Sequence, residues 1–367
     1  MAKQIETDLK TFIKFWTVPL IIIGALFFIE KSLTGLIIIG LSIFLALALR
    51  PLVNRVNSFF TKHFGKNDKH QTLSAVFAYL IVVIVVGGII ATVGPVVVNE
   101  TSRFVSNFPE TFENTFGGWD GVNEIGKSIG ISDLHGQIEN GLSNLSHSLL
   151  DLLSNNLFSS VSGIADVITK AVLVLVLTLL FLLEGPGMIN SLWSYLSSNE
   201  DKKMAKVARR TITKMANVVS TYVSRQVFGA ILDGCATMII VFILSLIFKF
   251  SPNLAIPMGM ITMLFYLIPM FGQFIGGTIV TILLMSSNLW AGLIFAVIYI
   301  AYAQIENNII APKIQGDALK LRPVMILSAI VIGMYMFGLL GAIIAIPIAG
   351  CIRVLIEEYP NIKAARN

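Results

Sequence analysis

The sequence is poor in charged residues. Of its 367 residues only 13% are Asp, Glu, Lys or Arg, whereas 55% are hydrophobic. Soluble domains usually carry about 25% charged residues. The apolar residues form runs of about twenty, separated by compact charged segments. This pattern excludes an ordinary soluble domain and predicts an all-α polytopic membrane protein whose partner is the lipid bilayer.

Cysteine and histidine are scarce as well, with two and four copies. Cys235 and Cys351 both lie in apolar segments, so no disulfide framework is predicted. The histidines lie in polar loops without the spacing of zinc ligands, and no G-x-S-x-G nucleophile motif occurs. We therefore expect no metal, no cofactor and no enzyme activity.

One phosphate-binding pattern is present but lacks its structural context. GVNEIGKS, from Gly121 to Ser128, matches G-x-x-x-x-G-K-[ST], yet a polar and aromatic stretch precedes it where a buried strand is required. The net charge of +5 arises from bases near span ends, which is a topology signal. Neither ATP nor nucleic acid is expected as a partner.

The distribution of charge predicts the orientation. The loop 50–71 holds five bases and one acid, and the segment 185–225 holds seven bases and two acids. The segment 99–156 holds eight acids and two bases. Because bases near span ends mark the cytoplasmic side, we predict a multi-pass protein of the cell membrane with both termini in the cytoplasm and 99–156 outside.

Five regions follow from the hydropathy pattern. Roughly, Phe15–Ile29, Leu33–Leu49 and Thr72–Val98 are predicted spans, and Ser160–Leu183 is a fourth. No small-residue cleavage site follows the first run, so we interpret it as a retained helix. The regions are 1–98 with three spans, 99–156 as an extracellular amphipathic helical segment, 157–184 as the fourth span, 185–225 as a basic cytoplasmic helical segment, and 226–367 as the transport core.

Two of these regions show helical periodicity outside the spans. In the outer segment one apolar face recurs every three or four residues, at Leu134, Ile138, Leu142, Leu145, Leu149 and Leu152. The bases of the 185–225 segment suit an anionic inner leaflet. A helix that braces the transport core is an equal alternative for that segment.

The second half contains two apolar stretches of unusual length. Spans at about 226–248 and 289–311 are followed by 254–285 and 324–355, each too long for one span and too short for two. Glycines break both, in LIPMFGQFIGG and YMFGLLGAI. Two re-entrant hairpins entering from opposite sides would form an inverted repeat, as in many secondary transporters. This gives about eight membrane segments; eight full spans is the alternative.

Charged residues inside apolar runs are costly and usually functional. Glu306 ends such a run among amide side chains, and a carboxylate in that setting can hold a cation, exchange a proton or bind the hydroxyls of a solute. Asp233 lies about two turns beyond a base in its span. The predicted solute or ion pathway comprises Glu306, Gln304, Asn307, Asn308, Asp233 and Arg225. The predicted membrane breaks and hinges are Pro269, Gly272, Gly276, Pro312, Gly316, Pro323, Gly338 and Gly341.

The same stretches resemble a known family. QIENNIIAPKIQG, the triplet from Leu321 to Pro323 and FGLLGAIIAIPIAG resemble the C-terminal signature of the autoinducer-2 exporter family, also called PerM-type permeases. LIPMFGQFIGG resembles its Pro-aromatic-Gly motif, and the resemblance covers essentially the whole chain. Two positions depart from the family: Gln273 stands where proline is frequent, and Arg322 where His or Ser is frequent.

The resemblance implies a secondary transporter that forms a homo-oligomer. Family members are reported to move autoinducer-2, and others are linked to sodium–proton exchange. We therefore expect an exporter of a small polar metabolite such as autoinducer-2. A sodium (or lithium)–proton antiporter with Asp233 and Glu306 as exchange sites is the first alternative. A non-transporting membrane scaffold, working through the outer amphipathic helix, is the second.

Overall fold

The protein consists of long helices with apolar surfaces. The computed structural model describes residues 2–64, 68–116, 161–198, 202–310 and 321–366, with a few isolated positions between them, and all regular elements in these ranges are helical. Six of the described helices are long and apolar enough to cross a membrane. Large apolar side chains also cover their exposed faces. The predicted all-α polytopic fold is confirmed.

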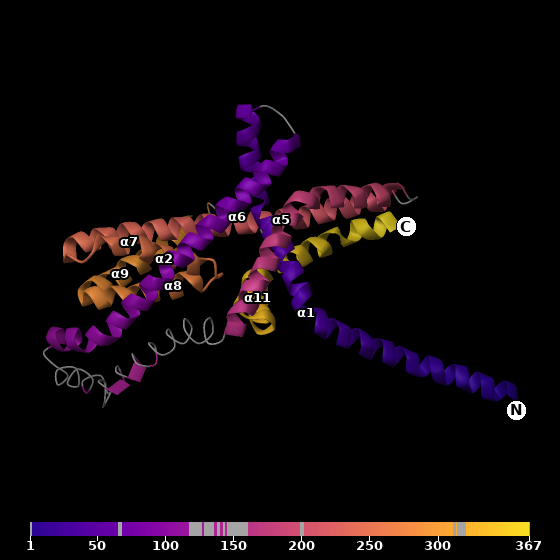
Figure 1. The fold of residues 1–367 in the computed structure, drawn as a ribbon, viewed down its shortest axis with the longest axis horizontal. Helices are drawn as coiled ribbons and strands as arrows, with labels where there is room; N and C mark the ends of the chain where they lie inside the picture. The colour runs from indigo at the N-terminus through magenta and orange to yellow at the C-terminus, as the bar shows by residue number, and fades with distance from the viewer. Residues whose placement is uncertain are drawn as a thin grey trace.

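The N-terminal helix corrects one prediction. α1 (Ala2–Phe64) is a single helix of 63 residues, where the sequence analysis predicts two spans separated near Glu30 and Lys31. Neither residue breaks a helix, and no proline or glycine lies between the two runs. The two predicted runs therefore lie on one continuous helix, without the turn expected between them. In Figure 1 the first part of α1 projects away from the other helices. The cytoplasmic N-terminus stays a prediction. It relied on a turn between the two runs, which the helix does not contain.

Two more helices pack with α1. These are α2 (Asp68–Phe116) and α5 (Val161–Ser198). The hydroxyl of Ser42 on α1 donates a hydrogen bond to the carbonyl of Val174 on α5 at 3.2 Å. Small residues of this kind let membrane helices approach closely. A second contact region joins α1, α2 and α5 through Val53, Ala75, Ala78, Leu182 and Leu183.

α6 (Lys202–Phe248) joins the basic segment to the transport core without a break. It is continuous across residue 225, and α5 likewise continues past residue 184 to Ser198. The residues at 185–225 therefore extend two long helices on either side of a short connection. With 47 residues, α6 is about 70 Å long, more than twice the thickness of a bilayer core.

The first broken segment is a helical hairpin. A short 3-10 turn η1 (Pro252–Leu254) leads into α7 (Ala255–Tyr266), and α8 (Gly272–Ser287) returns after a turn at 267–271. We call α7 and α8 hairpin 1. Their lengths of 12 and 16 residues correspond to about 18 and 24 Å, whereas a bilayer core is about 30 Å thick. Neither helix is long enough to cross.

Hairpin 1 packs against three longer helices. Its buried residues pack against α2, α6 and the following helix α9 (Leu289–Ile305). α8 contacts α7 closely at its first residue, because a Cβ on Gly272 would lie 1.9 Å from the carbonyl oxygen of Phe265. One turn later, a Cβ on Gly276 would lie 3.1 Å from the Cα of Thr262. This G-x-x-x-G spacing is typical of closely packed membrane helices.

The second broken segment also folds back on itself. α11 (Pro323–Arg366) has non-helical backbone at Phe337 and Gly338, and Gly338 has φ +61°, a conformation that glycine adopts freely. A Cβ on Gly341 would lie 2.0 Å from the carbonyl oxygen of Gly333. These glycines would be about 12 Å apart in a straight helix, so the chain reverses between them. We call the two arms of α11 hairpin 2.

The two hairpins contact neighbouring turns in the middle of α6. The side-chain amide of Gln226 donates to the carbonyl of Tyr266, next to the closed end of hairpin 1, at 2.7 Å. One turn earlier on α6, Tyr222 packs against hairpin 2, on the cluster formed by Ile330, Ala342 and Ile346. Earlier still, the Cys351 thiol lies 3.7 Å from the carbonyl of Met215. Both hairpins therefore pack on α6, while the inverted arrangement and the membrane side of each hairpin stay predictions.

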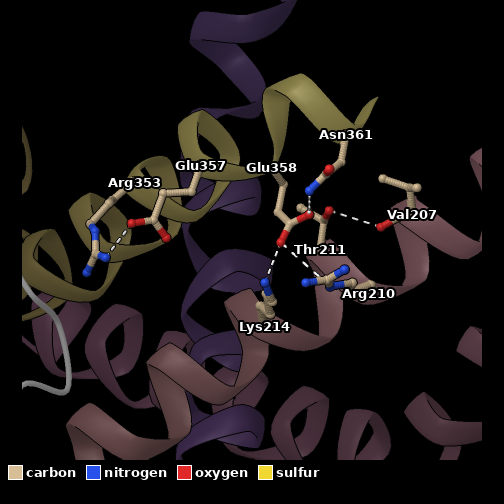
Figure 2. A network of polar contacts seen from close by, with 8 residues as sticks. All are labelled: Val207, Arg210, Thr211, Lys214, Arg353, Glu357, Glu358 and Asn361. Atoms are coloured by element: carbon tan, nitrogen blue, oxygen red, sulfur yellow. Dashed lines mark hydrogen bonds and ion pairs between the residues drawn. The ribbon is translucent and has the colours of Figure 1, made fainter. Parts of the chain in front are cut away.

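A charge network fixes hairpin 2 to the first half of α6 (Figure 2). Glu358 on α11 is only 3% exposed and pairs with Lys214 and Arg210, two bases of α6. Asn361 donates to the other carboxylate oxygen of Glu358 at 2.8 Å. The basic part of α6 therefore braces the core, which was one of the two roles expected of it.

Replacing Glu358 by Gln is expected to loosen this junction. The substitution leaves two bases without their shared acceptor, so the protein should unfold at a lower temperature, most clearly at low salt because screening weakens the pair. Glu357→Gln is the matched control, since Glu357 is 54% exposed and pairs with Arg353 one turn earlier. Thermal unfolding of both purified variants tests this; equal midpoints would contradict it.

Several predicted features lie outside the described residues. They include the six apolar positions of the outer amphipathic face and two of the predicted hinges, Pro312 and Gly316. Of the GVNEIGKS stretch only Lys127 is described. The predictions for these positions stand as stated.

Candidate functional site

Two carboxylates are buried where hairpin 1 closes. Asp233, on α6, has no exposed surface, and Glu306 is 1% exposed. Glu306 begins η2 (Glu306–Ile310), a π-helix that continues α9. In the described part of the chain, neither carboxylate is paired with a Lys, Arg or His side chain. Buried ionised groups without such partners are rare because their desolvation is expensive.

Gln273 joins the two carboxylates. Its side-chain nitrogen donates to Glu306 Oε2 at 2.8 Å and to Asp233 Oδ1 at 3.3 Å. Its side-chain oxygen accepts a hydrogen bond from Asn307 Nδ2 at 2.9 Å. Gln273 is the second residue of α8, so the turn of hairpin 1 delivers this amide to the centre. We call Asp233, Gln273 and Glu306 the carboxylate centre.

Hydroxyl groups surround the carboxylate centre. The phenol of Tyr299 donates to Asp233, 2.9 Å from Oδ1 and 3.2 Å from Oδ2. The side chains of Tyr266 and Tyr302 interact with Glu306. Each carboxylate is thus held by neutral donors, which orient the charge without cancelling it.

The local sequence explains how α9 contributes to the centre. Phe295, Tyr299, Tyr302 and Glu306 recur at spacings of four, three and four, so they share one helical face. Phe295 and Tyr299 are buried against hairpin 1, and their rings stack with centroids 5.3 Å apart. The helix widens into a π turn at Glu306, and such π segments are frequent at functional sites.

The carboxylate centre lies deep along its helices. Asp233 precedes the end of α6 by 15 residues, and Glu306 follows the start of α9 by 17. The end of α8 is 14 residues beyond Gln273. At 1.5 Å per residue, all three lie about 21–26 Å from the same end of the helix group. A bilayer core is about 30 Å thick. The distance from the centre to that end of the helices is therefore shorter than the thickness of the bilayer core.

The other predicted pathway residues are distributed unevenly. Asn307 reaches the carboxylate centre through Gln273. Gln304 and Asn308 are exposed and bond to each other at 3.2 Å, on a different face from Glu306. Arg225 lies eight residues before Asp233, about 12 Å along α6, and is not part of the centre. Its Nη1 atom is buried without a hydrogen-bond partner in the described residues.

The described hinge residues occupy the breaks. Pro269 lies in the turn of hairpin 1, and Gly272 and Gly276 lie on its second arm. Gly338 and Gly341 lie at the reversal of hairpin 2. Pro323 is the first residue of α11, a position that suits proline because its missing N–H is not needed there.

Sequence reasoning missed Gln273 and the tyrosines as site residues. In the sequence Gln273 stands out only as a departure from the family pattern, although a polar side chain directly after a glycine break is a possible signal of a site. Tyr299 is hidden in an apolar run. Within the described residues, no group of three or more His, Cys, Asp or Glu side chains could hold a metal ion.

Comparisons with known proteins agree with this architecture. Residues 17–361 match the family model described as AI-2E family transporter. Three curated relatives are each named "Putative transport protein". YueF of Bacillus subtilis is 20% identical over 361 residues, which are 94% of this chain and 93% of the relative. BpOF4_00890 of Alkalihalophilus pseudofirmus is 24% identical over 347 residues (89% of this chain and 82% of the relative), and sll0060 of Synechocystis is 25% identical over 210 residues (56% of each).

The matched region spans little more than half of the Synechocystis relative's length but almost all of YueF. Because the family model covers nearly the whole chain, it also confirms the resemblance seen in the signature motifs. The apolar helices and the family match together indicate a multi-pass membrane protein. The chain therefore belongs to the AI-2E family of transporters.

Proposed function

We propose that this protein is a secondary transporter that exports a small polar metabolite, such as autoinducer-2, and that proton uptake and release at the carboxylate centre drive the transport. Family membership supports transport. The solute and the outward direction rest on the family resemblance. The assignment to the cell membrane and the homo-oligomeric state are part of the same proposal.

The carboxylate centre is the observation that carries the coupling. The two bridged oxygens of Asp233 and Glu306 share one amide nitrogen, so they are at most about 6 Å apart. Two negative charges this close, buried and without a paired base in the described residues, repel each other strongly. Binding one positive charge relieves that repulsion. A site that gains and loses one positive charge at membrane depth is what a coupled transporter requires.

The polar groups around the centre suit a solute rich in hydroxyls. Three tyrosine hydroxyls and the amides of Gln273 and Asn307 provide donors and acceptors within one cluster. A solute hydroxyl could exchange with these groups when hairpin 1 moves. A non-transporting scaffold, the alternative of another class, has no use for such a buried polar cluster.

The first test is flux through the purified protein. Reconstituted into liposomes, it is expected to move autoinducer-2 faster than protein-free liposomes do, and an imposed pH gradient should change the initial rate. A family relative with proven flux would serve as the positive control. Equal rates with and without protein would contradict this solute, and protein-dependent flux that ignores the pH gradient would contradict proton coupling.

The sodium (or lithium)–proton antiporter alternative uses the same two carboxylates. It requires an alkali cation to reach both of them. In the structure the side-chain nitrogen of Gln273 lies between them, which favours proton-coupled solute transport over that alternative.

A further inference from the structure

Gln273 places an N–H group where a shared cation would have to bind. A hard cation held by two carboxylates sits between them and is coordinated by oxygen atoms. Here the position between Asp233 Oδ1 and Glu306 Oε2 is taken by the Gln273 side-chain nitrogen, with a hydrogen bond to each. The nitrogen can donate two hydrogens, one for each carboxylate.

The orientation of this amide is fixed by its surroundings. Turning the Gln273 side chain over would point its oxygen at two carboxylates and its nitrogen at the donor group of Asn307. Acceptor would then face acceptor, and donor would face donor. The two carboxylates, which can only accept, therefore direct the N–H groups of Gln273 toward themselves, and Asn307 complements this orientation by donating to the Gln273 oxygen.

A carboxamide cannot replace the charge of a cation. Gln273 is neutral, so it holds the two carboxylates together without removing their repulsion. A proton can still bind, because it attaches to a carboxylate oxygen and needs no space between the two groups. An alkali cation needs that space and several oxygen ligands. The amide nitrogen fills the space and presents hydrogen-bond donors there instead of oxygen ligands.

We propose that Gln273 is the residue that selects the coupling ion, by excluding sodium and lithium from the Asp233–Glu306 pair while leaving it open to protons. The two carboxylates could bind a cation between them, but the side-chain amide of Gln273 occupies that position. This inference rests on the proposed function only in taking the carboxylate centre as the coupling site.

The test measures cation binding directly on the full-length purified protein. Thermal unfolding is followed in NaCl, LiCl and choline chloride at equal ionic strength, for the wild type and for Gln273→Ala. The wild type is expected to unfold at the same temperature in all three salts. Gln273→Ala opens the space between the carboxylates, so NaCl and LiCl should stabilise it relative to choline, with a gain in cation affinity of about tenfold or more over the wild type.

A second variant separates selection from general damage. Asn307→Ala keeps the Gln273 amide and its two carboxylate partners and removes only the hydrogen bond to the Gln273 oxygen, so it is expected to show a smaller sodium response than Gln273→Ala. In the double variant Gln273→Ala with Asp233→Asn the response should disappear, because one carboxylate is gone. A sodium-specific stabilisation of the wild type would overturn the proposal, and so would a Gln273→Ala protein that unfolds alike in all three salts.

These outcomes are independent of the transport assay. If the sodium pattern appears but autoinducer-2 flux is absent, the role of Gln273 stands and the proposed solute falls. If flux is present and the wild type binds sodium, the proposed transport stands and the role of Gln273 falls.

Discussion

Replacing Glu306 by Gln is expected to reduce pH-driven solute flux to the level of protein-free liposomes. Glutamine has nearly the shape of glutamate and can still accept a hydrogen bond from Gln273, so the fold around hairpin 1 should survive. It cannot gain or lose a proton, and the remaining carboxylate, Asp233, loses the repulsion that makes the centre responsive. The measurement is the initial flux rate in liposomes with a fixed pH gradient.

Asp166→Asn is the matched control for Glu306→Gln. Asp166 is also a carboxylate on an apolar helix, but it is 58% exposed and pairs with Lys170 one turn later, at 2.6 Å. The control should keep wild-type flux. Full pH-driven flux in a correctly folded Glu306→Gln protein would show that the carboxylate centre does not couple transport.

Replacing Gly272 by Ala is expected to have the largest effect on stability. Its new methyl group would lie 1.9 Å from the carbonyl oxygen of Phe265, a backbone atom that cannot rotate away. The two arms of hairpin 1 must separate, at a cost of about 1–3 kcal/mol or more for overpacking of this kind. The adjacent residue is Gln273, so the carboxylate centre should be displaced as well. The thermal unfolding midpoint and the flux rate should both fall.

Gly87→Ala provides the comparison for this substitution. Gly87 lies in the long helix α2, and a Cβ there would meet no atom within 4 Å. Alanine also has the higher helix propensity, so this variant should be as stable as the wild type or slightly more stable. If Gly272→Ala unfolds at the same temperature as Gly87→Ala, the close contact between α7 and α8 is not required.

Much of the fold could be predicted from the sequence because the signals were local. Apolar runs and charged ends define long helices, and the glycines of LIPMFGQFIGG and YMFGLLGAI mark the two places where the chain reverses. Both stretches contain the triplet Met-Phe-Gly. In hairpin 1 the positive φ falls on Met270 of this triplet, whereas in hairpin 2 it falls on Gly338. The same three residues therefore build two different turns.

The features that could not be predicted depend on structure beyond a single sequence segment. α1 is continuous because Glu30 and Lys31 do not break a helix. A short charged stretch of this kind is compatible with either a turn or further helix, so the sequence could not decide between them. The carboxylate centre depends on contacts between residues 233, 273 and 306, which no periodicity within one segment can reveal. Glu306 could be singled out because a charge in an apolar run is unusual. Tyr299 could not, because a tyrosine there is ordinary.

The meeting of the two hairpins on α6 also bears on the electrical barrier. Hairpin 1 reaches Gln226 through the carbonyl of Tyr266 at its closed end, and hairpin 2 packs on Tyr222, four residues or about 6 Å earlier along the helix. If the hairpins enter from opposite sides, as the predicted inverted arrangement requires, and water follows each of them inward, the membrane voltage falls across much less than the roughly 30 Å of a bilayer core. A proton that crosses this region then moves through a large share of the voltage, so transport by this protein should respond to membrane potential as well as to pH.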